Sequence, residues 1–316
     1  MIYAYGARLP GGYHKRNNVV CQDYFAISKL GERAAVAAVA DGLGSVRHSD
    51  EGSKIAALAA VGHCAGLLAG IEANPKDEDV LDAIGESFAL ALREIRAEAA
   101  SKNRSADLYD TTLTLAALIG EDLYFGQSGD SGIIALLTTG EYARVTVQQR
   151  DELGRVFPLC FQNMWVVSKF GGKTAAALLA TDGMLELFSP SPAEIRVPLA
   201  EFFMNNMNLK IQATGENSVA AKMSDYMDSL PESQVNDDKT VAVLINARAK
   251  VGRQPKRYYA APAREEPRPE GGAEAPGLSG PADGAAPAPW LFALGFAVFL
   301  AAVSAGFLAW HYFAAV

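Results

Sequence analysis

Aspartate residues follow several short apolar runs in this chain. The run 36–40 is followed by Asp41 and Gly42, and the run 175–180 is followed one residue later by Asp182. An aspartate oxygen beside a glycine carbonyl suits a hard cation, because glycine has no side chain to block the approach. One Asp-Gly pair alone is typical of an ordinary turn, so the interpretation depends on the whole set.

Three more acidic segments belong to this set. They are Gln22-Asp23, Gly129-Asp130-Ser131 and Asp237-Asp238-Lys239-Thr240. All but the first place an aspartate at the edge of an apolar run that favours a buried strand. Carboxylates from separate strand ends can jointly hold Mg²⁺ or Mn²⁺, since these ions prefer oxygen ligands. The alternative for the set is a β-rich domain with acidic turns and no catalysis.

In order and spacing, these segments resemble the PPM-type, metal-dependent Ser/Thr protein phosphatases (type 2C-like), in a divergent bacterial branch. The resemblance ends with the last predicted strand, 240–246. It implies an α+β fold in which an antiparallel β-sandwich is flanked by helices and the metals lie at one end of the sheets. It also implies hydrolysis of phosphoserine and phosphothreonine by a metal-activated water at a binuclear Mn²⁺ or Mg²⁺ centre.

The resemblance assigns roles to individual residues. Asp41 corresponds to the metal-bridging aspartate of an Asp-Gly-x-Gly motif, and Gly42 to the carbonyl ligand beside it. Asp182 corresponds to the aspartate of a later Asp-Gly motif. Asp237 corresponds to the first residue of an Asp-Asn-x-Thr motif; Asp238 replaces the Asn, which leaves an exchange of roles open, with Asp237 preferred by register.

Two further metal residues and one substrate residue follow from the same resemblance. Asp23 corresponds to the aspartate of an Asn-Glu-Asp segment. In the family this aspartate contacts the metal through a bound water or lies just outside the direct ligands. Asp130 corresponds to the position that can help to hold a third, weaker metal. The family commonly has an arginine before the Asn-Glu-Asp segment that grips the substrate phosphate. No arginine has that spacing here, so His14 or Arg16 is the best substitute, and the predicted catalytic set is Asp41, Asp182, Asp237 and His14.

Composition excludes some other classes. The chain has 316 residues, half of them hydrophobic, which is enough for a sizeable core. Its net charge of −8 argues against a nucleic-acid partner bound by a basic surface. The cysteines Cys21, Cys64 and Cys160 have neither zinc spacing nor a paired pattern, which indicates a reducing compartment. The N-terminus shows no signal-peptide pattern.

Strands and two long helices must position the acidic residues. A hairpin turn at 30–33 predicts that Asp23 and Asp41 lie on neighbouring antiparallel strands. Helices are expected over 50–71 and 76–102, the latter with an apolar face. Strands between 111 and 147, joined by short turns, predict one continuous β-meander. Further helices are expected over 192–207 and 214–230.

The chain divides by composition into three parts. Residues 1–247 are the predicted catalytic domain, and 248–289 form a linker rich in Pro, Ala and Gly. Residues 290–316 carry no charged side chain and exceed the ~20 apolar residues that span a bilayer. This segment is the predicted single-pass C-terminal membrane anchor. Basic residues before it (Lys256, Arg257, Arg264 and Arg268) predict that the catalytic domain is cytosolic.

The expected partners are therefore phosphorylated proteins, targets of a Ser/Thr kinase by analogy with the family, met at the membrane. Two alternatives remain at this level. One is a pseudophosphatase that docks phosphoproteins without turnover. The other makes the last segment an oligomerisation helix in a soluble complex.

Overall fold

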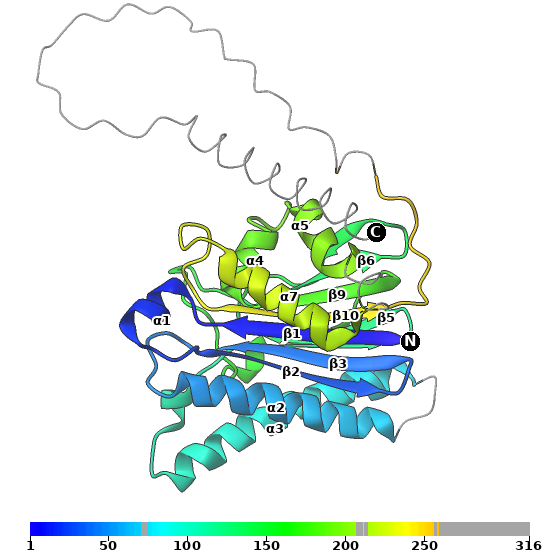
Figure 1. The fold of residues 1–316 in the computed structure, drawn as a ribbon. Helices are drawn as coiled ribbons and strands as arrows, with labels where there is room; N and C mark the ends of the chain where they lie inside the picture. The colour runs from blue at the N-terminus through cyan, green and yellow to red at the C-terminus, as the bar shows by residue number, and fades with distance from the viewer. Residues whose placement is uncertain (71–74, 207–210, 212–213, 256–257, 259–316) are drawn as a thin grey trace, which may run out of the picture. The chain divides into compact units, whose positions relative to one another are not determined.

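Ten strands form two five-stranded antiparallel sheets that lie face to face (Figure 1). The computed structural model describes residues 1–70, 75–206, 211, 214–255 and 258. The first sheet has the order β1-β10-β9-β6-β7, with β1 Ile2–Leu9, β10 Lys239–Asn246, β9 Thr174–Ala180, β6 Gly132–Leu137 and β7 Tyr142–Arg144. The second has the order β2-β3-β4-β5-β8, with β2 Asp23–Leu30, β3 Ala34–Asp41, β4 Leu113–Ile119, β5 Asp122–Ser128 and β8 Val166–Lys169.

Helices cover the outer face of each sheet (Figure 1). The second sheet is covered by α2 (Ser49–Ala69) and α3 (Asp77–Ser101). The first is covered by α4 (Asp182–Phe188), α5 (Val197–Glu201), a π-turn at Phe202–Asn206, and α7 (Glu216–Ser229). A short helix, α1 (Gly12–Asn17), joins β1 to β2, and 3-10 turns lie at Ala106–Tyr109 and Gln162–Met164. The predicted α+β sandwich is confirmed for the described residues.

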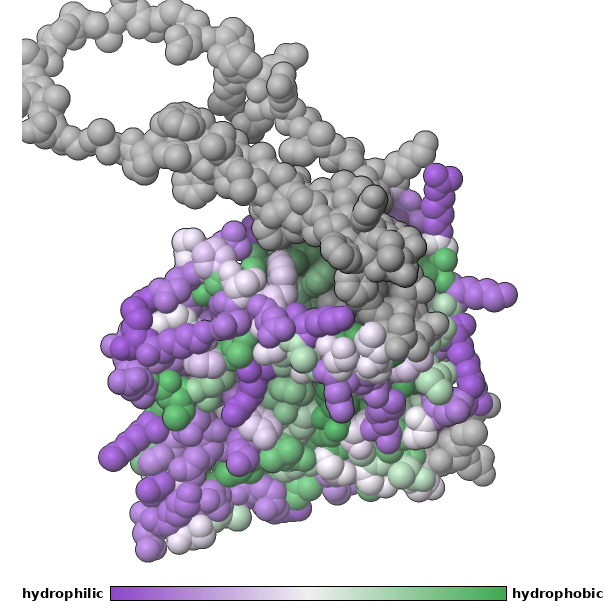
Figure 2. Space-filling model, in the orientation of Figure 1, coloured by the Kyte–Doolittle hydropathy of each residue, from purple (hydrophilic) through white to green (hydrophobic). Residues whose placement is uncertain are grey.

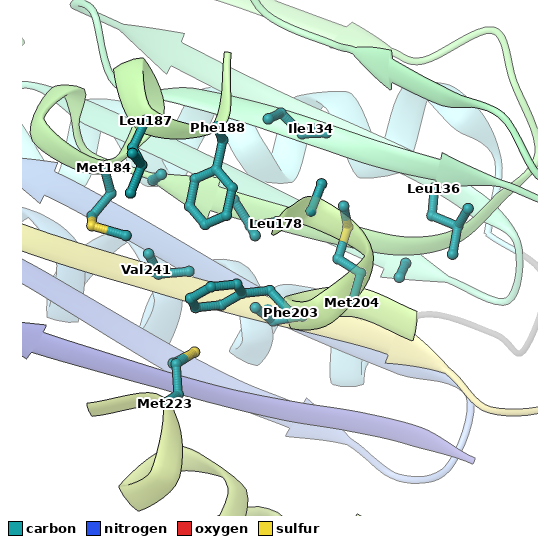
Figure 3. Close-up of a cluster of buried hydrophobic side chains, with 14 of the residues drawn as sticks. Ile134, Leu136, Leu178, Met184, Leu187, Phe188, Phe203, Met204, Met223 and Val241 are labelled. Atoms are coloured by element: carbon teal, nitrogen blue, oxygen red, sulfur yellow. The ribbon is translucent and has the colours of Figure 1, made fainter. Parts of the chain in front are cut away.

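Three apolar layers hold these elements together. Strand β3 shows why, because alternate side chains point to opposite faces of a strand. Ala37 and Val39 pack between the sheets, while Val36 and Ala38 pack against the helices α2 and α3. The run is continuously apolar because both of its faces are buried. A third layer lies under α4, the π-turn and α7, where Phe188, Phe203 and Met223 converge on β9 and β10 (Figure 3).

The two long helices are close to their predicted bounds. One face of α3 is buried, as expected for a helix with one apolar face: Val80, Ile84, Phe88, Leu92 and Ile95. Among the described residues, α2 is the one helix long and apolar enough to cross a membrane. Half of its most apolar window is buried, and α2 packs on α3, β2 and β3. We therefore interpret α2 as a core helix.

The predicted continuous β-meander is wrong. Strands β4 and β5 belong to the second sheet, whereas β6 and β7 belong to the first. The chain changes sheet at Gly129–Ser131, where Gly129 has a φ of +103°. Both faces of β6 are buried, so its sequence lacks the alternation that would identify a partner. The helix expected to begin at Pro192 begins only at Val197. The segment around His14, for which no helix was expected, is helical.

The C-terminal part of the described chain stays on the domain. The Gly252 N–H donates to the Thr138 carbonyl at 2.8 Å. The Tyr258 ring packs edge-on against Tyr142, with ring centroids 6.1 Å apart. These contacts extend past the predicted domain boundary at 247. Most of the predicted linker, and all of the predicted membrane anchor at 290–316, lie outside the described residues.

Candidate metal centre

An open cavity of about 450 Å³ lies where ends of both sheets meet. Five aspartates from four segments line it: Asp41, Asp130, Asp182, Asp237 and Asp238. His14 and Gly42 line it as well. The cavity thus gathers most of the predicted site residues. In the view of Figure 2, the end of the molecule that carries α1, which leads into this cavity, is largely hydrophilic.

Strand pairing places the first carboxylates. Asp23, the first residue of β2, pairs directly with Asp41, the last residue of β3. The backbone of Asp41 is fixed on its other side, because its N–H donates to Thr112 Oγ1 at 3.0 Å and its carbonyl accepts from the Thr112 N–H at 2.8 Å. The Gly42 N–H donates to the Gln22 carbonyl at 3.1 Å. Asp41 is therefore held at the strand end with its carboxylate in the cavity.

Three of the carboxylates form a tight cluster. Oxygens of Asp41, Asp130 and Asp182 all lie within 4.8 Å of one another. Burial, and then the charges of Asp23 and its acidic neighbours, raise the pKa of Asp41. Burial, followed by Asp130 and Asp237, raises the pKa of Asp182 to about 7. The three carboxylates therefore repel one another when they are ionised, and a bound cation would reduce this repulsion.

Asp130 provides the strongest sign of a fit to a cation. Its side chain is 1% exposed, and although Oδ2 lies 2.7 Å from Arg150 Nη2, neither oxygen has a hydrogen bond of good geometry among the described residues. Buried carboxylates normally have such partners or bind a metal. Because the cluster offers only oxygen ligands, it suits a hard cation such as Mg²⁺ or Mn²⁺ better than zinc.

The adjacent aspartates before β10 have different surroundings. Both oxygens of Asp238 are engaged: Oδ1 accepts from the Gly11 N–H at 2.7 Å, and Oδ2 accepts from the Gln22 N–H at 2.6 Å. Asp237 lines the cavity, and among the described residues its carboxylate accepts one hydrogen bond, from the adjacent Asp238 N–H at 2.8 Å. The geometry thus leaves Asp237 available to a cation and uses Asp238 to assemble the rim.

His14 is part of the same assembly. Its Nδ1 lies 2.7 Å from Asp238 Oδ1, and the residue is 8% exposed. Because Asp238 already accepts from two backbone N–H groups, it also accepts here, and His14 Nδ1 donates. The ring nitrogen left for the cavity is Nε2. Asp238, which stands where the family motif has Asn, is therefore in direct contact with His14, one of the two residues predicted to substitute for the family's Arg.

Asp23 lies behind the cavity. It is 2% exposed, does not line the cavity, and accepts from Thr181 Oγ1 at 2.7 Å. Burial, and next the charge of Asp238, raise its pKa. This position suits the predicted indirect role better than direct ligation.

Glycine is required beside Asp41 by close packing. A Cβ on Gly42 would lie 2.6 Å from the Ser49 carbonyl oxygen and 2.7 Å from the Gln22 carbonyl oxygen. A Cβ on Gly44 would meet only the flexible end of Gln22, at 3.8 Å. Gly42 therefore allows α2 and the start of β2 to approach the site, whereas this packing does not require a glycine at position 44.

Arg150 is a site residue that the sequence reasoning missed. Its Nη2 lies 2.7 Å from Asp130 Oδ2 and 3.2 Å from Asp182 Oδ2. Arg150 belongs to the irregular stretch 148–162, which has no periodic pattern to orient a side chain. The stretch contains a small hairpin closed by a bridge between Arg150 and Val156, and Val156 lines the cavity.

Comparison with known proteins agrees with this geometry. A family model described as protein phosphatase 2C matches residues 10–228. Among curated proteins, none matches the chain by sequence.

Solved structures show the same fold at low sequence identity. A bacterial serine phosphatase aligns with a TM-score of 0.50 and 12% identity, over 78% of this chain and 98% of that one. The serine-threonine phosphatase 2C from Toxoplasma gondii aligns with a TM-score of 0.53 and 16% identity, over 77% and 94%. A serine/threonine phosphatase from S. agalactiae aligns with a TM-score of 0.52 and 16% identity, over 78% and 99%.

Proposed function

Because the chain belongs to the protein phosphatase 2C family, and is thus a protein phosphatase by class, we propose that it hydrolyses phosphoserine and phosphothreonine with Mn²⁺ or Mg²⁺. The single observation that carries the metal dependence is the cluster of Asp41, Asp130 and Asp182, whose oxygens lie within 4.8 Å of one another. Two divalent cations would be held by Asp41, the Gly42 carbonyl, Asp182 and Asp237. When bound, they supply a water of lowered pKa and neutralise charge on the phosphoryl oxygens.

The chain's own residues orient the substrate. His14 lines the cavity, and its bond to Asp238 fixes the ring. We assign His14 Nε2 to the substrate phosphate or the leaving oxygen, in place of the arginine that the family commonly has. Arg16 is a poorer choice, because it forms an ion pair with Glu232 and both side chains are about half exposed.

The location of the protein is a separate proposal. The uncharged segment 290–316 would anchor it in a membrane, and the basic residues before that segment would keep the phosphatase domain cytosolic. Its substrates would then be phosphorylated proteins at the membrane surface, the targets of a Ser/Thr kinase.

Turnover of a phosphothreonine peptide tests the enzymatic proposal. The full chain, purified in detergent, is assayed with Mn²⁺, with EDTA, and as the variants Asp41→Asn and Asp182→Asn. Asp225→Asn, which removes an exposed carboxylate on α7, is the control. We expect Mn²⁺-dependent turnover in the wild type and the control, and a loss of at least about 10²-fold in both site variants. Metal binding without turnover in the wild type would favour a phosphoprotein-docking role instead.

A further inference from the structure

A protein cation already lies at one end of the acidic cluster. The Arg150 guanidinium contacts Asp130 Oδ2 at 2.7 Å and donates to Asp182 Oδ2 at 3.2 Å. Glu186 Oε1 is 4.0 Å from the same nitrogen. Two of these three carboxylates belong to the tight cluster, so Arg150 neutralises the side of the cluster that faces α4.

Arg150 is held there by its neighbour in the chain. The Gln149 N–H donates to the Gly129 carbonyl at 3.1 Å, and Gln149 Oε1 accepts from the Gly129 N–H at 2.9 Å. Gln149 Nε2 donates to the Met164 carbonyl at 2.8 Å. The segment that carries Arg150 is therefore fastened to the residue next to Asp130. Because the backbone beside it is fixed in this way, Arg150 is held close to Asp130. An exposed arginine without such contacts would form only a weak surface ion pair.

The same place cannot hold both cations. A divalent ion on Asp130 would lie within a few Å of the guanidinium, and the repulsion between a double and a single positive charge is strong there because the Asp130 side chain is only 1% exposed. The hairpin around Arg150 would have to move before such an ion could bind. Among the described residues, Arg150 meets Asp182 through Oδ2 alone and contacts neither Asp41, Asp237 nor the Gly42 carbonyl, so these groups remain available to the other two ions.

From these contacts we infer that Arg150 takes the place of a third metal ion at Asp130, so that this chain binds two divalent cations and admits a third only when the guanidinium is removed. The inference rests on the metal centre of the proposed function. It assigns Asp130 to an ion pair with Arg150 and departs from the family expectation of a weak metal ligand at this position.

Mn²⁺ binding measured by calorimetry on the full chain tests this inference. We expect the wild type to bind two ions and Arg150→Gln to bind a third, or to bind its weakest ion at least about tenfold more tightly. Arg150→Lys keeps a positive charge and should behave like the wild type. Arg155→Gln is the matched control on the same segment, since Arg155 pairs with Asp151 and its side chain is 75% exposed.

A double variant identifies the position of the additional ion. Adding Asp130→Asn to Arg150→Gln should remove the third binding event and leave the other two. Three ions bound by the wild type, or unchanged number and affinity in Arg150→Gln, would overturn the inference while leaving the phosphatase proposal intact. Absence of any Mn²⁺ binding in a wild type that is folded by circular dichroism would instead refute the metal centre, and the inference with it.

Discussion

At the scale of single residues, the site accumulates negative charge that Arg150 neutralises only on one side. The ordinary pKa of aspartate is near 4, whereas burial, Asp130 and Asp237 raise that of Asp182 to about 7. In the metal-free protein, the unfolded state therefore ionises at lower pH than the folded state. The contribution of Asp182 to stability is present below about pH 4 and is lost as the pH rises to about 7.

Replacing this carboxylate should stabilise the protein without metal. In EDTA at pH 8, we expect Asp182→Asn to raise Tm by about 3 °C or more, the effect of about 1 kcal/mol in a domain of this size. At pH 4 the two proteins should have similar Tm values. Thermal unfolding over pH 4–8 measures the difference, with Asp225→Asn as control. Equal Tm values at pH 8 would contradict the electrostatic account.

The His14–Asp238 contact leads to a kinetic prediction. His14→Gln and Asp238→Asn should each lower kcat/KM by about 10²-fold, and the double variant should lose little more, because both act through one contact. Calorimetric Mn²⁺ affinity should be unchanged, since neither side chain is assigned to a metal.

Arg16→Gln is the matched control for this prediction, since Arg16 is the other residue of the same helix that was predicted to contact the phosphate. Its kcat/KM should stay near that of the wild type. A large loss in Arg16→Gln with none in His14→Gln would transfer the substrate contact to Arg16.

At the scale of elements, the approach of α2 to the ends of β2 and β3 depends on a missing Cβ. Gly42→Ala would place a methyl group against two carbonyl oxygens, and Gly44→Ala would not. We expect Gly42→Ala to lower the free energy of unfolding by about 1–3 kcal/mol and to weaken Mn²⁺ binding. Gly44→Ala should change both by little. Urea unfolding and calorimetry measure the two effects, and equal behaviour of the two variants would exclude close packing as the cause.

Local chain connections were predictable from the sequence. The short turn at 30–33 requires β2 and β3 to pair, which brings Asp23 opposite Asp41. The apolar spacing in 76–102 identified α3 for the same reason, because a single face of the helix is buried. These features depend on residues that are near one another in the sequence.

Long-range placement was not predictable in the same way. One partner of β6 is β9, roughly 40 residues further along the chain, and both strands are buried on both faces. Arg150 reaches Asp130 only because Gln149 binds Gly129, a contact between side chain and backbone without a sequence pattern. The role of Asp238 likewise appears only once Gly11 and Gln22 are brought to it.

At the scale of the whole molecule, the part of the chain after β10 leads to a test of location. The contacts of Gly252 and Tyr258 indicate that a fragment without the predicted anchor should continue past 258 rather than end at 247, for example to 261. In cell fractionation, the full chain should sediment with membranes and resist a carbonate wash, whereas 1–261 should be soluble and retain Mn²⁺-dependent turnover. A full chain found in the soluble fraction without detergent would exclude the anchor.

The aspartates also come from both layers of the sandwich. Asp41 ends a strand of one sheet, while Asp182 and Asp237 adjoin β9 and β10 of the other. An ion bound by Asp41 and by Asp182 or Asp237 would cross-link the two sheets. One sheet could then not slide over the other without loss of the ion. Small apolar residues between the sheets, such as Ala37 and Ala177, then control the spacing of the ligands although they lie away from the cavity.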